Sequence, residues 1–206
     1  LWQLDGEVRA GYETYQFRAA LSAIVEFCNV DLSAFYVDVR KDSLYCDAPW
    51  SLRRRACRSA LSEVFQRLTA WLAPILPFTM EEAWLTRFPD VGSVHLRQFP
   101  ETPTSWRDDE AENIMRKLLW VRSAVTGALE IARREKLIGS ALEAWPRVYV
   151  PDPKQYAEVM SIDFAELCIT SGITVENGYG PADIKFRLPA EVGEQNRIAV
   201  DVEKAP

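Results

Sequence analysis

The chain has 206 residues, of which 48% are hydrophobic and 26% are charged, and its formal net charge is −6. This composition excludes a largely disordered chain, and the low counts of 9 Gly and 12 Pro exclude a collagen-like or low-complexity design. No apolar run approaches the ~18 residues that a membrane span needs, and no signal-peptide pattern is present. The length predicts one large domain or two small ones. The chain begins at Leu1 rather than Met, so we expect it to be a piece of a longer polypeptide.

The charge is distributed unevenly along the chain. Residues 51–72 carry five Arg and one Glu, a net charge of +4, whereas residues 151–206 carry five basic and ten acidic groups, a net charge of −5. The four cysteines form no C-x-x-C pair and there is one histidine, so a zinc site is not expected. The cysteines are typical of small core residues in a reduced, cytosolic protein. No P-loop, G-x-G-x-x-G, G-x-S-x-G or H-E-x-x-H motif occurs, so no complete catalytic site is predicted.

Helical periodicity dominates the first 137 residues. Apolar residues recur at helical spacing over residues 8–28, and Asn29 and Asp31 are expected to break this helix and cap the next one, which runs to about residue 45. The third helix begins after Ser51, a suitable N-cap. Its stripe is the clearest in the chain, with each step three or four residues long: Leu61, Val64, Phe65, Leu68 and Leu72.

Prolines mark the end of that helix, and a shorter helix follows it. Residues 88–107 hold three prolines and are predicted to form a loop with one short strand, residues 94–96. A long helix is then predicted from Asp108 or Asp109 to about Leu137, with Gly139 as its C-cap. The tryptophans Trp71 and Trp84 are interpreted as core or interhelix residues.

Beyond Ala144 the pattern changes to short alternating, β-branched runs. Strands are predicted at residues 147–150, 167–170, 184–188 and 197–202, and a short helix at residues 154–160. The predicted fold is therefore mainly α: an antiparallel helical bundle over residues 1–140, with a small α+β C-terminal appendage over residues 141–206.

A cluster of arginines lies in the first two turns of the third helix: Arg53, Arg54, Arg55 and Arg58. Positive charge at a helix N-terminus is locally unfavourable, and a capping box would place Glu at position 54, where the chain has Arg54. Guanidinium groups beside exposed helix N–H groups are typical of an anion site, and phosphate is the obvious ligand. Arg40 and Lys41 close the preceding helix nearby, and Tyr45, Trp50 and Trp120 offer surfaces on which unpaired bases could stack.

A second interpretation of the same residues stays open. Asp38, Asp42 and Asp47 are close in sequence to the basic residues and can pair with them as a solvated surface network. Surface networks of this kind need no ligand.

Two longer segments resemble a known family. Residues 31–45, Asp-Leu-Ser-Ala-Phe-Tyr-Val-Asp-Val-Arg-Lys-Asp-Ser-Leu-Tyr, together with Arg53-Arg-Arg, resemble isoleucyl-tRNA synthetase in its anticodon-binding helical domain. Residues 72–84, which contain Ala-Pro-Ile-Leu-Pro-Phe-Thr and Glu-Glu-x-Trp, are similar to all the related synthetases for isoleucine, valine, leucine and methionine. The resemblance is strong over about residues 1–138 and weaker beyond.

The departures from the family are informative. Its catalytic signatures His-Ile-Gly-His and Lys-Met-Ser-Lys-Ser are missing, and so are its editing domain and the cysteine-rich zinc module that many bacterial members carry at their C-terminus. The resemblance therefore implies an excised, non-catalytic domain. No cofactor is expected in it, although the parent resembles an ATP- and Mg-dependent isoleucine–tRNA ligase.

The resemblance implies that the domain binds the anticodon stem and loop of isoleucine tRNA, in a cytoplasmic, monomeric enzyme with no membrane partner. By charge and position, the residues expected to face the RNA are Arg40, Lys41, Arg53, Arg54 and Arg58, with Arg122 as a weaker candidate. Two alternatives remain. The chain could be a protein-interaction domain that docks on its own catalytic domain, or the equivalent domain of the valyl, leucyl or methionyl enzyme.

Overall fold

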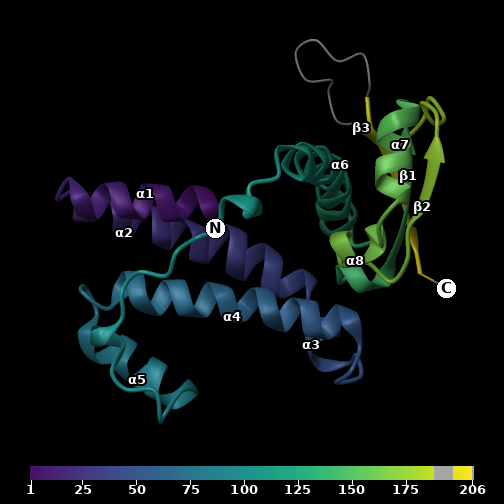
Figure 1. Cartoon of the computed structure of the whole chain (residues 1–206). Coiled ribbons are helices and arrows are strands. Elements are labelled where there is room, and N and C mark those ends of the chain that lie inside the picture. Colours follow the sequence, from purple (N-terminus) through teal and green to yellow (C-terminus); the bar gives the residue numbers. More distant parts are fainter. Residues whose placement is uncertain (188–196, 206) are drawn as a thin grey trace. The chain divides into compact units, whose positions relative to one another are not determined.

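The structure is a computed structural model that describes residues 1–187 and 197–205 (Figure 1). Its residues divide into two compact units, Leu1–Arg107 and Asp108–Pro206. The first unit is helical, and its α-helices are α1 (Trp2–Glu13), α2 (Phe17–Glu26), α3 (Lys41–Tyr45), α4 (Leu52–Leu72) and α5 (Pro77–Arg87). A π-helical segment, Phe27–Val37, continues α2, and two short 3-10 helices lie at Val94–Leu96 and Thr104–Trp106.

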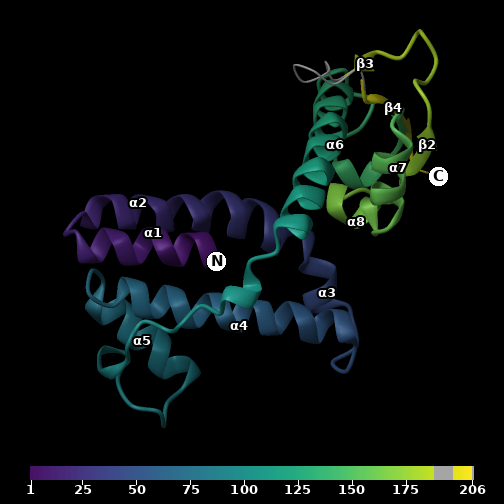
Figure 2. The same cartoon turned by 45° about the horizontal axis from the view of Figure 1, so that its top comes forward.

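The first predicted helix is in fact an antiparallel pair, because the chain reverses between α1 and α2 (Figures 1 and 2). Tyr15 adopts the left-handed conformation, with φ 58°, at this reversal. Gly11 allows the two helices to approach closely, since a Cβ there would lie 2.8 Å from the Cβ of Ala20. The reversal brings Val8 and Ile24, each nearly inaccessible, into one core with Leu4 and Trp71.

The predicted helix break at Asn29 and Asp31 is wrong. The backbone stays helical through this segment as a π-helix, Phe27–Val37, and both side chains are exposed. A polar residue on the solvent face costs a helix little, so these two residues do not end it.

One helical run, Phe17–Val37, is long and apolar enough to cross a bilayer on length and composition alone, with a mean hydropathy of 1.4 over its best window. A count of consecutive apolar residues misses this run because Arg18, Glu26 and Asp31 interrupt it. Only 11% of the window is buried, and a single run of this kind is weak evidence for a membrane span.

The core of the first unit confirms the interpretation of its tryptophans. Trp71 is inaccessible, and Tyr12 donates a hydrogen bond of 2.6 Å from its hydroxyl to the Trp71 carbonyl. Trp84 is 3% exposed, and its indole N–H donates to the carbonyl of Gly92 at 2.9 Å. The predicted strand at residues 94–96 is a 3-10 helix instead, whose N-cap Ser93 accepts a hydrogen bond from the backbone N–H of His95. This turn lets Val94 pack against Trp84.

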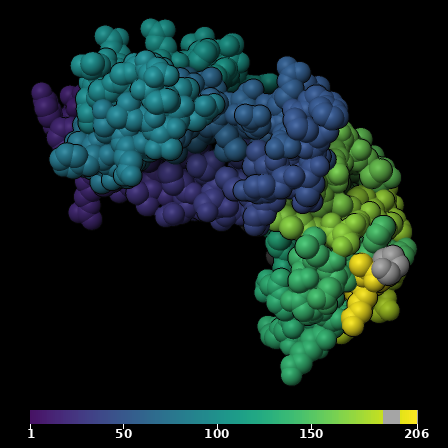
Figure 3. All heavy atoms as spheres, turned by 90° about the horizontal axis from the view of Figure 1, so that it is seen from below, coloured from purple at the N-terminus to yellow at the C-terminus, as the bar shows by residue number. Residues whose placement is uncertain are grey.

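The second unit is a four-stranded sheet covered by helices. Its elements are α6 (Asp109–Arg134), a 3-10 helix (Ala141–Glu143), β1 (Ala144–Val150), α7 (Pro153–Met160), α8 (Phe164–Cys168), β2 (Thr174–Asn177), β3 (Phe186–Arg187) and β4 (Ala199–Lys204). The strand order is β2-β1-β4-β3; β1 pairs with β2 in parallel, and β4 is antiparallel to both β1 and β3. In the space-filling view the end of β4, in yellow, lies at the surface against green residues of its own unit (Figure 3).

The mainly α fold with a small α+β part is confirmed, but the units divide at Arg107 rather than at residue 140. The buried face of α6, which includes Leu118, Val121, Val125 and Leu129, packs with the sheet and with α7 and α8. Helical periodicity assigned α6 to the bundle because periodicity reports a buried face and not the partner that covers it. The helix ends at Arg134, before the expected C-cap at Gly139.

The C-terminal strand predictions were correct in part. β1, β3 and β4 overlap the predicted runs, and α7 confirms the predicted short helix. Residues 167–170 were predicted as a strand, but they hold the end of α8 and a left-handed cap at Ile169. β2 was not predicted, and residue 188 of the predicted strand 184–188 lies outside the described residues. The expectation that all four cysteines are core residues is wrong for Cys46, which is exposed.

Arg67 is a buried cation that secures the loop after α5 to α4. It is 2% exposed, donates to the carbonyl of Glu101 at 2.8 Å and to the hydroxyl of Thr102 at 3.1 Å, and pairs with Glu63 at 2.6 Å. Its guanidinium also lies over the ring of Trp106, 4.4 Å from the centroid. All of these partners except Glu63 come from the loop, so the loop depends on this side chain.

Replacing Arg67 by Met should therefore destabilise the chain by about 2–3 kcal/mol, since Met keeps the aliphatic stem but removes the hydrogen bonds and the ion pair that the buried guanidinium makes. Urea denaturation followed by circular dichroism measures this change. The control is Arg18→Met on the exposed face of α2, which should stay within about 0.5 kcal/mol of the parent chain. Equal effects of the two substitutions would contradict the assignment.

A second prediction concerns Cys168 and the pH dependence of stability. Burial raises the pKa of the Cys168 thiol from its ordinary value of 9.0 to about 12. The folded chain thus keeps a proton that the unfolded chain releases, so this contribution to stability is present below pH 9 and is lost as the pH rises towards 12. The free energy of unfolding should fall less steeply with pH in Cys168→Ala than in the parent chain over that window. Parallel curves would exclude the contribution of this thiol.

Candidate nucleic-acid interface

The predicted N-cap of α4 is confirmed. The hydroxyl of Ser51 accepts a hydrogen bond of 3.1 Å from the backbone N–H of Arg54. The cap fixes where the helix begins, and it therefore fixes which faces the next four arginines occupy. Arg55 and Arg58, three residues apart, share one face of the helix.

Asp47 secures the loop before α4 to two of these arginines. Its carboxylate Oδ2 accepts a hydrogen bond from the Nε of Arg53 at 3.1 Å, and its backbone carbonyl accepts one from the Nη1 of Arg54 at 2.7 Å. Arg54 is half-buried, and among the described residues its Nε has no hydrogen-bond partner. These contacts confirm, for Asp47, the alternative interpretation that nearby aspartates pair with the arginines. They also show that Arg54 holds the loop in place.

Arg55 and Arg58 differ from the first two arginines. Both are exposed, and within residues 1–187 and 197–205 neither makes an ion pair or a side-chain hydrogen bond. Arg55 was not included among the residues expected to face RNA. Its spacing of three residues from Arg58, which places both on one helix face, was the signal that could have identified it. The two guanidiniums are the groups at this helix start that are available to an external anion.

The other predicted basic residues of the first unit are engaged locally. Lys41 pairs with Asp38 at 2.5 Å, a contact that raises the pKa of the Lys41 ammonium, and its side chain stays 61% exposed. Arg40 is the half-buried N-cap of α3 and lies close enough to Tyr36 to affect its titration. Burial, followed by the neighbouring thiol of Cys57 in α4, raises the pKa of Tyr36 to about 12.

Arg122 belongs to the second unit, and the structure gives it a local role. Its Nε donates a hydrogen bond of 2.8 Å to the carbonyl of Leu167, so the side chain joins α6 to the end of α8. Its contact with RNA stays a prediction, as do those of the other basic residues.

Exposed aromatic side chains flank the arginines. Tyr45, at the end of α3, is 81% exposed, and Trp50, in the turn before α4, is 80% exposed. Trp120, the third residue predicted to stack on bases, is half-buried in α6 of the other unit. We call the exposed residues Tyr45, Trp50, Arg53, Arg55 and Arg58 the α4 basic surface.

The α4 basic surface contains two kinds of side chain that can bind single-stranded nucleic acid. Guanidiniums bind phosphates as charge-assisted hydrogen-bond donors, and exposed aromatic rings accept unstacked bases. Within the described part of the chain, no three His, Cys, Asp or Glu side chains gather as a metal site.

Comparison with known proteins places the chain in a family. The family described as the anticodon-binding domain of tRNA ligase matches residues 2–149. The chain therefore belongs to the anticodon-binding domains of tRNA ligases.

The similar proteins compared with this chain are tRNA ligases for one amino acid, isoleucine. The chain is 53% identical over its whole length to the isoleucine–tRNA ligase of Agrobacterium fabrum and 54% identical over its whole length to that of Brucella abortus. It is also 54% identical to the isoleucine–tRNA ligase of Ruegeria pomeroyi over 91% of its length. The chain spans about one fifth of the length of these relatives, 21%, 21% and 19% respectively.

Proposed function

We propose that this chain recognises the anticodon stem and loop of isoleucine tRNA, and that it does so through the α4 basic surface. Aminoacylation would be carried out by a catalytic part of the parent ligase, with ATP and Mg²⁺ bound there and none needed in this chain. The observation that carries the proposal is the pair of unpaired, exposed guanidiniums of Arg55 and Arg58 in the first two turns of α4, which follow the turn that carries the exposed ring of Trp50. The proposal includes action as a monomer in the cytoplasm, with no membrane partner.

The positive charge at the start of α4 favours phosphate binding there, although the net charge of the whole chain is negative. A phosphate at the start of α4 would be attracted by the helix dipole and by the arginines together. The first arginines hold the loop, and the next two are left for the ligand, so RNA binding would not require the ion pair of Arg53 with Asp47 to break. On binding, Arg55 and Arg58 would exchange contacts with water for contacts with phosphate, and no ion pair within the chain would be lost.

A docking role is the second candidate, and the acidic second unit favours it. On its sheet, Arg147 pairs with Glu176 at 2.9 Å and with Glu203 at 3.3 Å, so part of the acidity is neutralised internally. Pull-down of the upstream part of the parent ligase separates the two functions. Tight association without tRNA, unaffected by added tRNA, would favour docking over RNA recognition.

The first test removes the two unpaired guanidiniums. Filter binding of an isoleucine anticodon stem-loop to Arg55→Ala/Arg58→Ala should show weaker affinity at low salt. It should also show a salt dependence whose log–log slope is smaller by about 0.7–0.9 for each lost phosphate contact.

The matched control is Arg116→Ala/Arg134→Ala, which removes two exposed arginines from α6. Equal losses in the two double variants would indicate general attraction by net charge and would contradict the assignment of the site. Arg54→Ala is a poorer test, because the loss of its hydrogen bond to Asp47 disturbs the loop itself.

The second test concerns base stacking. Trp50→Leu should weaken stem-loop binding by about 1–3 kcal/mol while leaving the salt slope unchanged, since stacking releases no counterions. Trp50→Phe should keep most of the affinity because it keeps an aromatic face. Phe78→Leu is the control, since Phe78 is 90% exposed on α5. If both Leu variants bind like the parent chain, Trp50 does not contact a base.

A further inference from the structure

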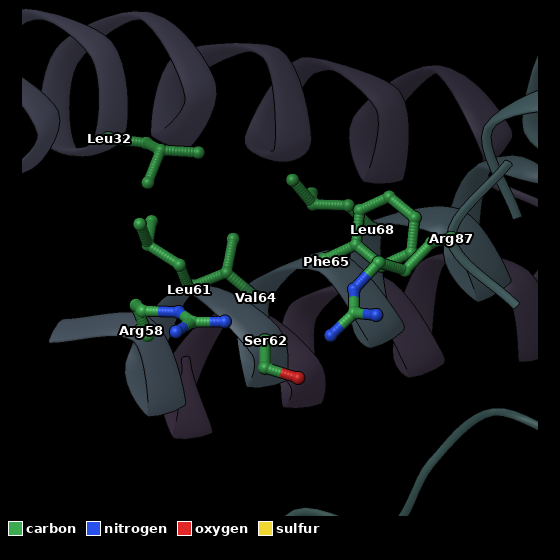
Figure 4. A pocket seen from close by; sticks show the side chains of 8 residues that line it. All are labelled: Leu32, Arg58, Leu61, Ser62, Val64, Phe65, Leu68 and Arg87. Atoms are coloured by element: carbon green, nitrogen blue, oxygen red, sulfur yellow. The ribbon is translucent and has the colours of Figure 1, made fainter. Parts of the chain in front are cut away.

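A groove lies between the π-helical segment and α4, entirely within the first unit (Figure 4). Its volume is about 530 Å³, and its apolar wall consists of Leu32, Leu61, Val64, Phe65 and Leu68. Figure 4 shows Leu32 facing Leu61 across the space, with Arg58 near one end of the groove and Arg87 near the other.

Four of the apolar wall residues belong to the stripe that the helical periodicity of the sequence places on one face of α4. Leu61, Val64, Phe65 and Leu68 follow the spacing i, i+3, i+4, i+7, but only Val64 is buried, and the other three stay partly open. Seven residues of α-helix span about 10.5 Å. The stripe thus lines the groove over two helical turns with side chains that stay partly open, although Phe65 also packs against the core around Trp84 and Leu68 against the core around Trp71.

Charge at the two ends of the groove is uncompensated. Within the described residues Arg58 has no ion pair or side-chain hydrogen bond. The guanidinium of Arg87 lies over the ring of Phe88, 4.9 Å from the centroid, and it likewise has no acidic partner there. An occupant with negative charge at both ends of an apolar middle would complement this arrangement.

The chemistry of the groove favours a peptide over a nucleobase. Its wall is mainly aliphatic, and apart from the two guanidiniums only the hydroxyl of Ser62 can hydrogen-bond to a ligand side chain. The polar edge of a base would lose its hydrogen bonds to water against such a wall. The one aromatic ring, Phe65, already stacks on Trp84 at an interplanar angle of 10°.

We propose that this groove docks an amphipathic α-helix of a partner protein, with a two-turn apolar stripe flanked at each end by carboxylates. A helix laid along α4 repeats the spacing i, i+3, i+4, i+7 and so matches the stripe of the groove in period and length. Its terminal carboxylates would pair with Arg58 and Arg87. This function is separate from RNA recognition, although the two would share Arg58.

Fluorescence anisotropy with two synthetic helical peptides tests the proposal on the intact chain. Both peptides carry the same leucine stripe; one is flanked by Glu and the other by Lys. The Glu-flanked peptide should bind about tenfold more tightly, and the double variant Arg58→Glu/Arg87→Glu should reverse that order. Leu61→Asp should abolish binding of both peptides, whereas Leu96→Asp, a control at a site 86% exposed, should not.

Three results would overturn the proposal. The first is equal binding of the two peptides, or no binding of either. The second is an order of affinities that charge reversal leaves unchanged. The third is weaker binding of the anticodon stem-loop to both Arg87→Ala and Leu61→Asp without any peptide binding, which would assign the groove to RNA.

Discussion

The hydrogen bonds between Asp47 and the first turn of α4 determine how the basic surface is presented. The Asp47 carboxylate binds Arg53 and its carbonyl binds Arg54, so the loop that carries Trp50 is fixed against the helix. Two arginines are used in this way, and Arg55 and Arg58 remain free of protein partners among the described residues. A helix start with four arginines is locally unfavourable, and the structure relieves it by giving the first pair a structural role.

Helical periodicity predicted most of the elements because it depends on short-range geometry. The helix start at Ser51 follows from side-chain chemistry alone, and the hydrogen bond to Arg54 confirms it. The reversal at Tyr15 could not be predicted in this way, because neither Gly nor Pro marks it and its conformation has a positive φ. The packing of Val8 on Ile24 determines that turn, and a contact between residues sixteen positions apart is invisible to a local pattern.

The candidate site was predictable to the extent that charge and sequence position define it. The cluster of arginines and the aromatic residues beside it were evident in the sequence. The sequence did not show which arginines hold the loop and which stay exposed. That distinction depends on the backbone carbonyl of Asp47, whose direction no residue type encodes. The same limit applies to Arg122, since its partner is the carbonyl of Leu167, 45 residues away.

Arg58 links the two surfaces of α4. It shares a face with Arg55, and Leu61 and Ser62 follow it one turn later, so the basic surface passes directly into the apolar groove. A phosphate bound by Arg58 would neutralise the charge at one end of the groove and weaken the docking of an acidic helix there. By thermodynamic linkage the docked helix would weaken RNA binding by the same factor. The spacing of residues on one helix therefore couples the proposed RNA surface to the proposed protein-docking groove without any change in conformation.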